Sequence, residues 1–122
     1  MTKNDKVGGK YRVKIMPTAQ QDLREAIQYI AKDSPGNARK FAKEVRERIN
    51  NVLGNSPNSC LPPRGYPFLA EQGYKRFSAH TNYSALGVWN GQVIEVHRIL
   101  HNKRNWMIVM GGKSQSTDEE EV

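Results

Sequence analysis

Two consecutive segments of this 122-residue chain carry apolar side chains at helical spacing, and this pair of stripes constrains the fold more than any other feature. They cover residues 19–31 and 35–53, and the second begins with a proline and a glycine that break the first helix. In each segment the apolar residues recur every three or four positions, as on one face of an α-helix. Two such helices form an antiparallel hairpin, whose apolar face must be buried against a second layer.

The ends of both predicted helices carry recognisable signals. Pro17 ends the segment before the first helix, and Thr18 is expected to cap that helix from the next residue onward. Ser34 is expected to cap the second helix, with Pro35 in the first helical position, where a missing N–H costs nothing. Gly54 is expected to end the second helix.

Four short segments with strand patterns can supply the second layer. The first alternates apolar and polar residues, and the last is apolar on both faces, which favours a central place in a sheet. Asn90-Gly91 predicts a type I′ hairpin turn between the last two. The first strand is expected to pair beside one of the other three, and the stretch 55–73, with its four prolines, is expected to be irregular. The four segments are residues 11–16, 74–80, 83–89 and 92–100.

The sequence therefore predicts a two-layer α+β domain of order β-α-α-β-β-β, with an antiparallel sheet packed against a helical hairpin. Residues 1–10 are expected to form a flexible N-terminal tail, 11–112 the folded domain, and 113–122 an acidic, disordered C-terminal tail. The domain holds 15 lysines and arginines against 7 aspartates and glutamates. This excess favours a nucleic acid or an acidic protein segment as partner, the alternative being a generic basic surface.

Several classes of protein are disfavoured by composition. The single cysteine, Cys60, excludes an internal disulfide, and cysteines and histidines do not occur at the spacing of a zinc site. No apolar stretch approaches the roughly 20 residues that a membrane-spanning helix needs, and the first residues lack the apolar core of a signal peptide. We therefore expect a cytoplasmic protein without a metal.

Four pieces of the chain, in order and at matching spacing, resemble the RelE/ParE toxin superfamily of bacterial type II toxin–antitoxin modules, and its ParE-like branch most closely. The first two pieces are a strand that ends in Pro17 before a helix, and a second helix that follows Pro35. The third is YKRFSAHTNY at residues 74–83, and the fourth is an apolar strand followed by HNKR at residues 101–104. The resemblance covers about residues 11–106.

This resemblance implies a small toxin without metal or organic cofactor, held by a cognate antitoxin in a hetero-oligomer. ParE-like members poison DNA gyrase, and this plasmid-stabilisation type of activity is the first expectation. RelE-like members cut messenger RNA on the ribosome, so the first alternative is a ribosome-dependent mRNA endonuclease. The second alternative is an inactive binding module, because Lys75-Arg76 departs from the arginine placement of ParE-like strands. The antitoxin is expected to lay an acidic or amphipathic segment across the basic sheet and the hairpin, as a helix in a groove or as an added strand.

Candidate site residues follow from the chemistry of each alternative. Metal-free RNA cleavage needs a general base, a general acid and cations that stabilise the charged transition state. The candidates for proton transfer, if the protein is a nuclease, are His80, Tyr83 and His101. The candidates for binding a target or a phosphate are Lys75, Arg76, Arg98, Lys103 and Arg104.

Structural roles compete with these assignments. A histidine beside a turn, such as His80, can hydrogen-bond a loop, and His101 at a strand end can cap exposed carbonyls. Lys103-Arg104 can form a solvated edge. His97 in mid-strand, and both tryptophans, Trp89 and Trp106, are expected to have packing roles.

Overall fold

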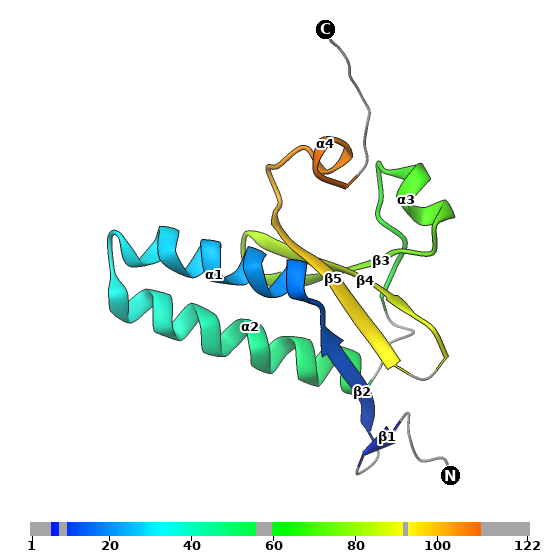
Figure 1. Cartoon of the computed structure of the whole chain (residues 1–122), viewed down its shortest axis with the longest axis horizontal. Helices are drawn as coiled ribbons and strands as arrows, with labels where there is room; N and C mark the ends of the chain where they lie inside the picture. Colours follow the sequence, from blue (N-terminus) through cyan, green and yellow to red (C-terminus); the bar gives the residue numbers. More distant parts are fainter. Residues whose placement is uncertain (1–5, 8–9, 56–59, 92, 111–122) are drawn as a thin grey trace, which may run out of the picture.

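The structure, a computed structural model, describes residues 6–7, 10–55, 60–91 and 93–110 (Figure 1). A five-stranded sheet in the order β1-β2-β5-β4-β3 is combined with a hairpin of two long helices. β2 and β5 are parallel, and the other neighbours are antiparallel. The elements are β1 Lys6–Val7, β2 Lys10–Ile15, α1 Pro17–Ala31, α2 Pro35–Asn55, α3 Pro67–Glu71, β3 Lys75–His80, β4 Tyr83–Trp89, β5 Val93–His101 and α4 Trp106–Met110.

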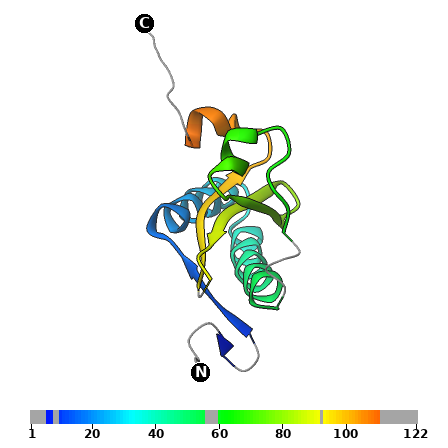
Figure 2. The ribbon, with the colours of Figure 1, turned by 90° about the vertical axis from the view of Figure 1, so that its right-hand side faces the viewer.

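The predicted fold class is confirmed, and so is the central place of β5, which lies between β2 and β4. The hairpin of α1 and α2 covers one face of the sheet (Figures 1 and 2). Its apolar stripes meet the sheet residues of that face in the main core. The helical contribution to this core is Ala19, Leu23, Ala26, Phe41, Val45, Ile49 and Leu53, and the strands add Ala79, Ala85, Ile94, Val96 and Ile99.

A β-bulge in β5 explains why its apolar residues do not alternate strictly. Leu86 pairs with Arg98 but Gly87 pairs with Val96, so His97 is the extra residue. An extra residue reverses the alternation of faces beyond it. Ile99 therefore joins Val96 in the main core, while Leu100 turns to the opposite face.

A second, smaller core lies on that opposite face. Leu86 and Leu100 of the sheet pack there with Leu69 of α3 and Trp106 of α4, and all four are at most 1% exposed. The two short helices lie side by side at one end of the sheet (Figures 1 and 2). The segment that was predicted to be irregular thus contains α3, and the predicted packing role of Trp106 is confirmed.

Three local predictions at the helix ends have different outcomes. The Ser34 cap is confirmed, since its Oγ accepts a hydrogen bond from the Asn37 N–H at 3.1 Å. The Thr18 cap is wrong, because α1 begins at Pro17 and Met16 at its N-cap has no side-chain cap bond. Proline suits the first helical position, so it starts this helix as well as ending the strand. Gly54 does not end α2, which continues to Asn55.

The last hairpin forms as predicted, but its turn lies one residue further on. The Asn90 N–H bonds to the Val93 carbonyl at 3.2 Å, and Trp89 pairs with Ile94, so Asn90 and Val93 close the turn. Gly91, with a φ of 97°, supplies the left-handed backbone conformation.

The two predicted tails are described only in part. Lys6 pairs with Tyr11 in a short β1–β2 hairpin, so part of the N-terminal tail continues the sheet. The acidic segment 113–122 lies outside the described residues. Among the helices of the described part, none combines the length and apolarity required to cross a bilayer.

Candidate functional site: an arginine-lined cleft and the end of the sheet

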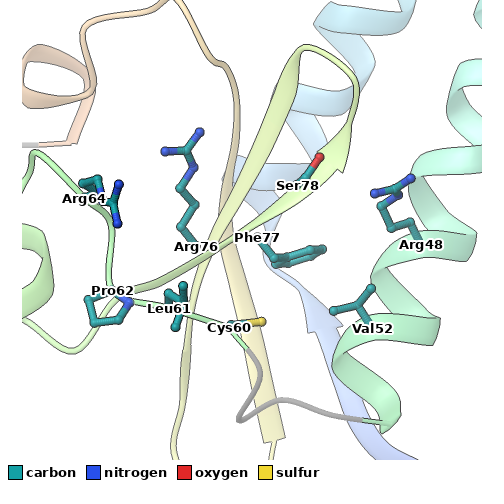
Figure 3. Close-up of a pocket in the computed structure, with 9 residues that line it drawn as sticks. All are labelled: Arg48, Val52, Cys60, Leu61, Pro62, Arg64, Arg76, Phe77 and Ser78. Carbon is teal, nitrogen blue, oxygen red and sulfur yellow. The ribbon is translucent and has the colours of Figure 1, made fainter.

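A cleft of about 690 Å³ runs beside β3 and is lined by three arginines from three separate parts of the chain. We call it the arginine cleft. Arg76 comes from β3, Arg48 from α2, and Arg64 from the segment before α3 (Figure 3). Its lining includes no aspartate or glutamate, so it presents a positive surface. The lining residues are Arg48, Val52, Cys60, Leu61, Pro62, Arg64, Arg76, Phe77 and Ser78.

Arg76 is held in place by neutral groups. Its Nε donates to Ser84 Oγ at 3.1 Å, and that hydroxyl donates in turn to Asn102 Oδ1 at 2.6 Å. The guanidinium also lies over the Trp106 ring, 4.7 Å from the centroid. These contacts fix the side chain by hydrogen bonding and cation–π attraction without neutralising its charge. Arg76 is therefore a pre-positioned cation.

The Trp106 ring can support the Arg76 guanidinium because two contacts hold the ring in place, one from the end of β5 and one from the residue before α3. Its indole Nε1 donates to the His101 carbonyl at 3.1 Å, and its ring stacks on Tyr66 at 5.0 Å. The chain after β5 therefore orients Arg76 on β3.

The three proton-transfer candidates lie together around the turn between β3 and β4. Tyr83 pairs with His80 across that turn and with His101 on β5. The Tyr83 ring lies 5.0 Å from the His101 ring and 5.1 Å from the Phe41 ring. The Nε2 of His80 lies 2.7 Å from the Glu44 carboxylate on α2.

Each of the three is engaged in a local contact. The hydrogen bond to His80 lowers the pKa of Glu44, which favours the charged carboxylate as its partner. Burial raises the pKa of Tyr83, with a smaller contribution from Tyr29, so Tyr83 is a neutral phenol at neutral pH. His101 Nδ1 accepts the Lys103 N–H at 3.1 Å, in keeping with the capping role considered for it.

Arg98 lies apart from the arginine cleft. Its Nε and one terminal nitrogen each donate to the Asp22 carboxylate at 2.8 Å, and the Asp22 side chain is only 7% exposed. This hydrogen-bonded pair raises the pKa of Arg98. The sequence-based assignment of Arg98 to target binding does not fit this geometry, because a bidentate carboxylate already occupies its guanidinium and joins α1 to β5.

The remaining predicted cations are exposed but do not form one group. Lys103 and Arg104 follow β5, where the Asn102 N–H bonds to the Asn82 carbonyl at 2.8 Å and holds this segment against the β3–β4 turn. Lys75 lines a separate small depression with Trp89. Lys75 and Arg76, as neighbours on a strand, face opposite sides of the sheet.

Three important residues were missed by the sequence analysis. Arg48 is one of several charged residues on the polar face of α2, and Arg64 lies in a proline-rich stretch, so neither has a local signal. Asp22 did carry a local signal. It falls on the apolar stripe of α1 between Ala19 and Ala26, and a carboxylate buried there needs a partner. Within the described ranges, no three histidine, cysteine or acidic side chains gather as metal ligands would.

Comparisons with known proteins complete the description. Residues 13–106 match the model of a family described as the ParE toxin of type II toxin-antitoxin system, parDE. No curated protein matches the chain. A solved structure described as the chromosomal ParDE TA system from P. aeruginosa is similar at a TM-score of 0.60 and 20% identity, covering 74% of this chain and 94% of that one. That likeness shows a shared fold. The family match spans most of the chain, which therefore belongs to the ParE toxin family of type II toxin–antitoxin systems.

Proposed function

We propose that this type II toxin inhibits DNA gyrase and that its cognate antitoxin neutralises it by covering the basic surface. The observation that carries the proposal is a division of roles among the polar residues. The proton-transfer candidates are held in packing and hydrogen-bonding contacts, whereas Lys103 and Arg104 are exposed beside the β3–β4 turn. A surface of this kind suits binding better than proton transfer.

The chemistry of the cluster supports binding over catalysis. A general base must have a free lone pair within reach of the proton that it removes. His80 Nε2 is directed at Glu44, the Nδ1 lone pair of His101 accepts a backbone N–H, and the raised pKa of Tyr83 disfavours a phenolate. His101 and Tyr83 therefore lack a base ready for a ribose hydroxyl, and the contacts with Glu44 and Phe41 hold the His80 ring against α2.

A DNA supercoiling assay with purified gyrase tests the proposal. Wild-type protein in excess is expected to stop supercoiling, and Lys103→Glu/Arg104→Glu is expected to need about ten times more protein for the same effect, because charges across an interface set association and specificity. Arg12→Glu is the matched control, since Arg12 is an exposed cation paired with Val93 at the far end of β5. Full supercoiling with wild-type toxin in excess would contradict the proposal.

A ribosome-dependent mRNA endonuclease is the second candidate, favoured by the proximity of Tyr83 and His101 to the exposed Lys103 and Arg104. Primer extension on a translated message distinguishes the two. Cuts within codons that disappear in Tyr83→Phe and His101→Gln would establish this second function, and an intact message would exclude it. Unchanged growth when the chain is produced without antitoxin would instead indicate the inactive binding module.

A further inference from the structure

The segment after β5 is held against Arg76 at two points. At the first, Arg76 Nε donates to Ser84 Oγ at 3.1 Å, and that hydroxyl donates to Asn102 Oδ1 at 2.6 Å. At the second, the Arg76 guanidinium lies over the Trp106 ring, 4.7 Å from the centroid. The residues between Asn102 and Trp106 are therefore fixed beside the side chain of Arg76.

Two of the residues between these points are exposed cations. Lys103 and Arg104 lie in a tight turn, in which the Arg104 N–H donates to the His101 carbonyl at 3.0 Å. Another cation, Arg64, lies on the same side of β3 as Arg76 (Figure 3). We call Arg64, Arg76, Lys103 and Arg104 the four-cation surface. It combines side chains from three separate parts of the chain.

The four-cation surface is not neutralised by acidic side chains of the fold. Among the residues that the structure describes, none of its four side chains lies within ion-pair distance of a carboxylate. Residues 60–91 and 93–110 together contain six lysines and arginines but only two acidic residues. Of these two, Glu95 lies 3.1 Å from His97 Nε2, and Glu71 belongs to α3. The surface therefore favours an anionic partner.

The polar groups of this surface are hydrogen-bond donors. Guanidinium and ammonium groups have no acceptor atoms. Two exposed asparagines beside them add further donors, because Asn102 Oδ1 accepts the Ser84 hydroxyl and Asn105 Oδ1 accepts the Met107 N–H at 3.0 Å. The oxygen of each amide is used within the fold, and its NH2 group remains as a donor. Such a surface is complementary to a partner that presents acceptors alone.

We propose that the four-cation surface binds the phosphate backbone of duplex DNA. Phosphate oxygens are acceptors alone, whereas an acidic polypeptide also presents backbone N–H donors, which this surface does not match. The partner rests on the proposed function, because gyrase acts on duplex DNA and a toxin bound to gyrase is brought close to that DNA. The toxin then contacts the DNA as well as the enzyme. Phosphate contacts carry no sequence information directly, so this binding is independent of sequence.

The salt dependence of DNA binding tests the proposal. The probe is a fluorescent 20-base-pair duplex of mixed sequence (about two turns), bound to the toxin without gyrase and followed by anisotropy at several salt concentrations. Each neutralised phosphate contributes about −0.9 to the slope of log K against log salt, so four cations predict a slope of about −3.6. Arg64→Gln should reduce its magnitude by about 1, and Lys103→Gln/Arg104→Gln by about 2. Arg46→Gln is the control, because Arg46 is an exposed cation on α2 outside this surface.

Two further measurements separate phosphate binding from damage to the fold. Asn102→Asp keeps the shape and the acceptor for Ser84 but replaces an NH2 donor with a charged oxygen, which repels phosphate. We expect it to weaken DNA binding by about tenfold, with urea unfolding close to that of wild type. A duplex with methylphosphonate linkages, which lack the phosphate charge, repeats the test on the wild-type protein. Wild type is expected to bind it at least about tenfold more weakly than the normal duplex.

Four outcomes would overturn the inference. They are a wild-type slope smaller in magnitude than about 1, equal slopes for Lys103→Gln/Arg104→Gln and Arg46→Gln, equal binding of the methylphosphonate duplex, and displacement of DNA at lower concentration by polyglutamate or by RNA. The supercoiling assay separates this result from the proposed function. A toxin that binds DNA with the predicted slope but leaves gyrase active keeps the four-cation surface and removes gyrase as the target. A toxin that inhibits gyrase without binding DNA keeps gyrase and overturns the inference.

Discussion

Two stretches of the sheet lack a neighbouring strand on one side, namely β5 beyond Val96 and the outer edge of β3, and their backbone groups are covered in different ways. β2 pairs with β5 only as far as Val96, and the chain then turns into α1. Beyond that point Asp22 takes the place of a strand, because its carboxylate accepts the Ile99 N–H at 3.0 Å. On β3, Leu61 pairs with Arg76 alone. A side chain seals the first edge, whereas in the described part of the chain the second is bridged at Arg76.

The arginines at the two edges differ in the same sense. Arg98 shares the buried carboxylate that seals its edge, so its charge is neutralised within the fold. Arg76 is fixed by a hydroxyl and an indole ring, which leave its charge unbalanced in the cleft. In this fold Arg98 therefore has a structural role, and Arg76 remains a candidate for binding.

The largest effect on this contrast is expected from Asp22→Ala. The change removes the partner of Arg98 and the acceptor of the Ile99 N–H, and it is expected to lower the free energy of unfolding by about 3 kcal/mol, as for a broken buried pair. Urea unfolding measures the loss. Asp33→Ala, at an exposed position after α1, is the control and is expected to change stability by less than about 0.5 kcal/mol. A loss similar to the control would mean that Asp22 does not seal this edge.

Gly87→Ala tests the bulge that brings Arg98 and Ile99 to the sealed edge. A Cβ at Gly87 would press against the backbone carbonyl oxygen of Glu95, which cannot move without disturbing the strand pairing. We expect a loss of about 2 kcal/mol in thermal or urea unfolding, typical of overpacking. Gly36→Ala, where no atom lies within 4 Å of the added carbon, should be neutral or slightly stabilising. Equal stability of the two variants would show that β5 does not need this close approach.

Ser84→Ala tests the neutral partner of Arg76, and its expected effect is smaller. It removes the hydrogen bonds to Arg76 and Asn102 but breaks no ion pair, so a loss of about 1 kcal/mol is expected in urea unfolding. If Ser84→Ala were as damaging as Asp22→Ala, neutral partners would stabilise the fold as strongly as the buried carboxylate, and the contrast between the edges would fail.

The smallest effect concerns pH at the contact between α2 and the β3–β4 turn. The hydrogen bond to His80 lowers the folded-state pKa of Glu44, so Glu44 contributes stability above its unfolded value of about 4.3. That contribution is lost as the pH falls through the lowered folded value. Unfolding of wild type and Glu44→Gln, compared at pH 7 and at pH 3, should show a larger pH dependence for wild type. Parallel pH profiles would contradict the assignment.

The sequence predicted the elements with short-range signals. The stripes of α1 and α2, the Ser34 cap and the positions of the main strands along the chain depend on residues within a few positions of each other, and they were predicted correctly. The local errors have local causes, since Pro17 suits a helix start as well as a strand end. α3 was missed because a helix of five residues is too short to show a periodic stripe.

The candidate site was less accessible to sequence reasoning. Arg76 was identified from its strand, but its companions Arg48 and Arg64 have no pattern that links them to it. Arg98 was grouped with the binding cations, although Asp22, 76 residues away, occupies it. Partners at such separations depend on strand order and register, which no short window of sequence contains.

The sequence by itself determined a basic domain with a helical hairpin against a mostly antiparallel sheet, because periodicity and end signals are properties of neighbouring residues. The tertiary structure alone decided which positive charges are neutralised and which are presented. That decision depends on the bulge at His97, on the carboxylate that closes one edge, and on the packing of Trp106 under Arg76. Each of these brings together groups that are distant in sequence. Electrostatic interactions depend on the distance between charges in space, not on their separation along the chain.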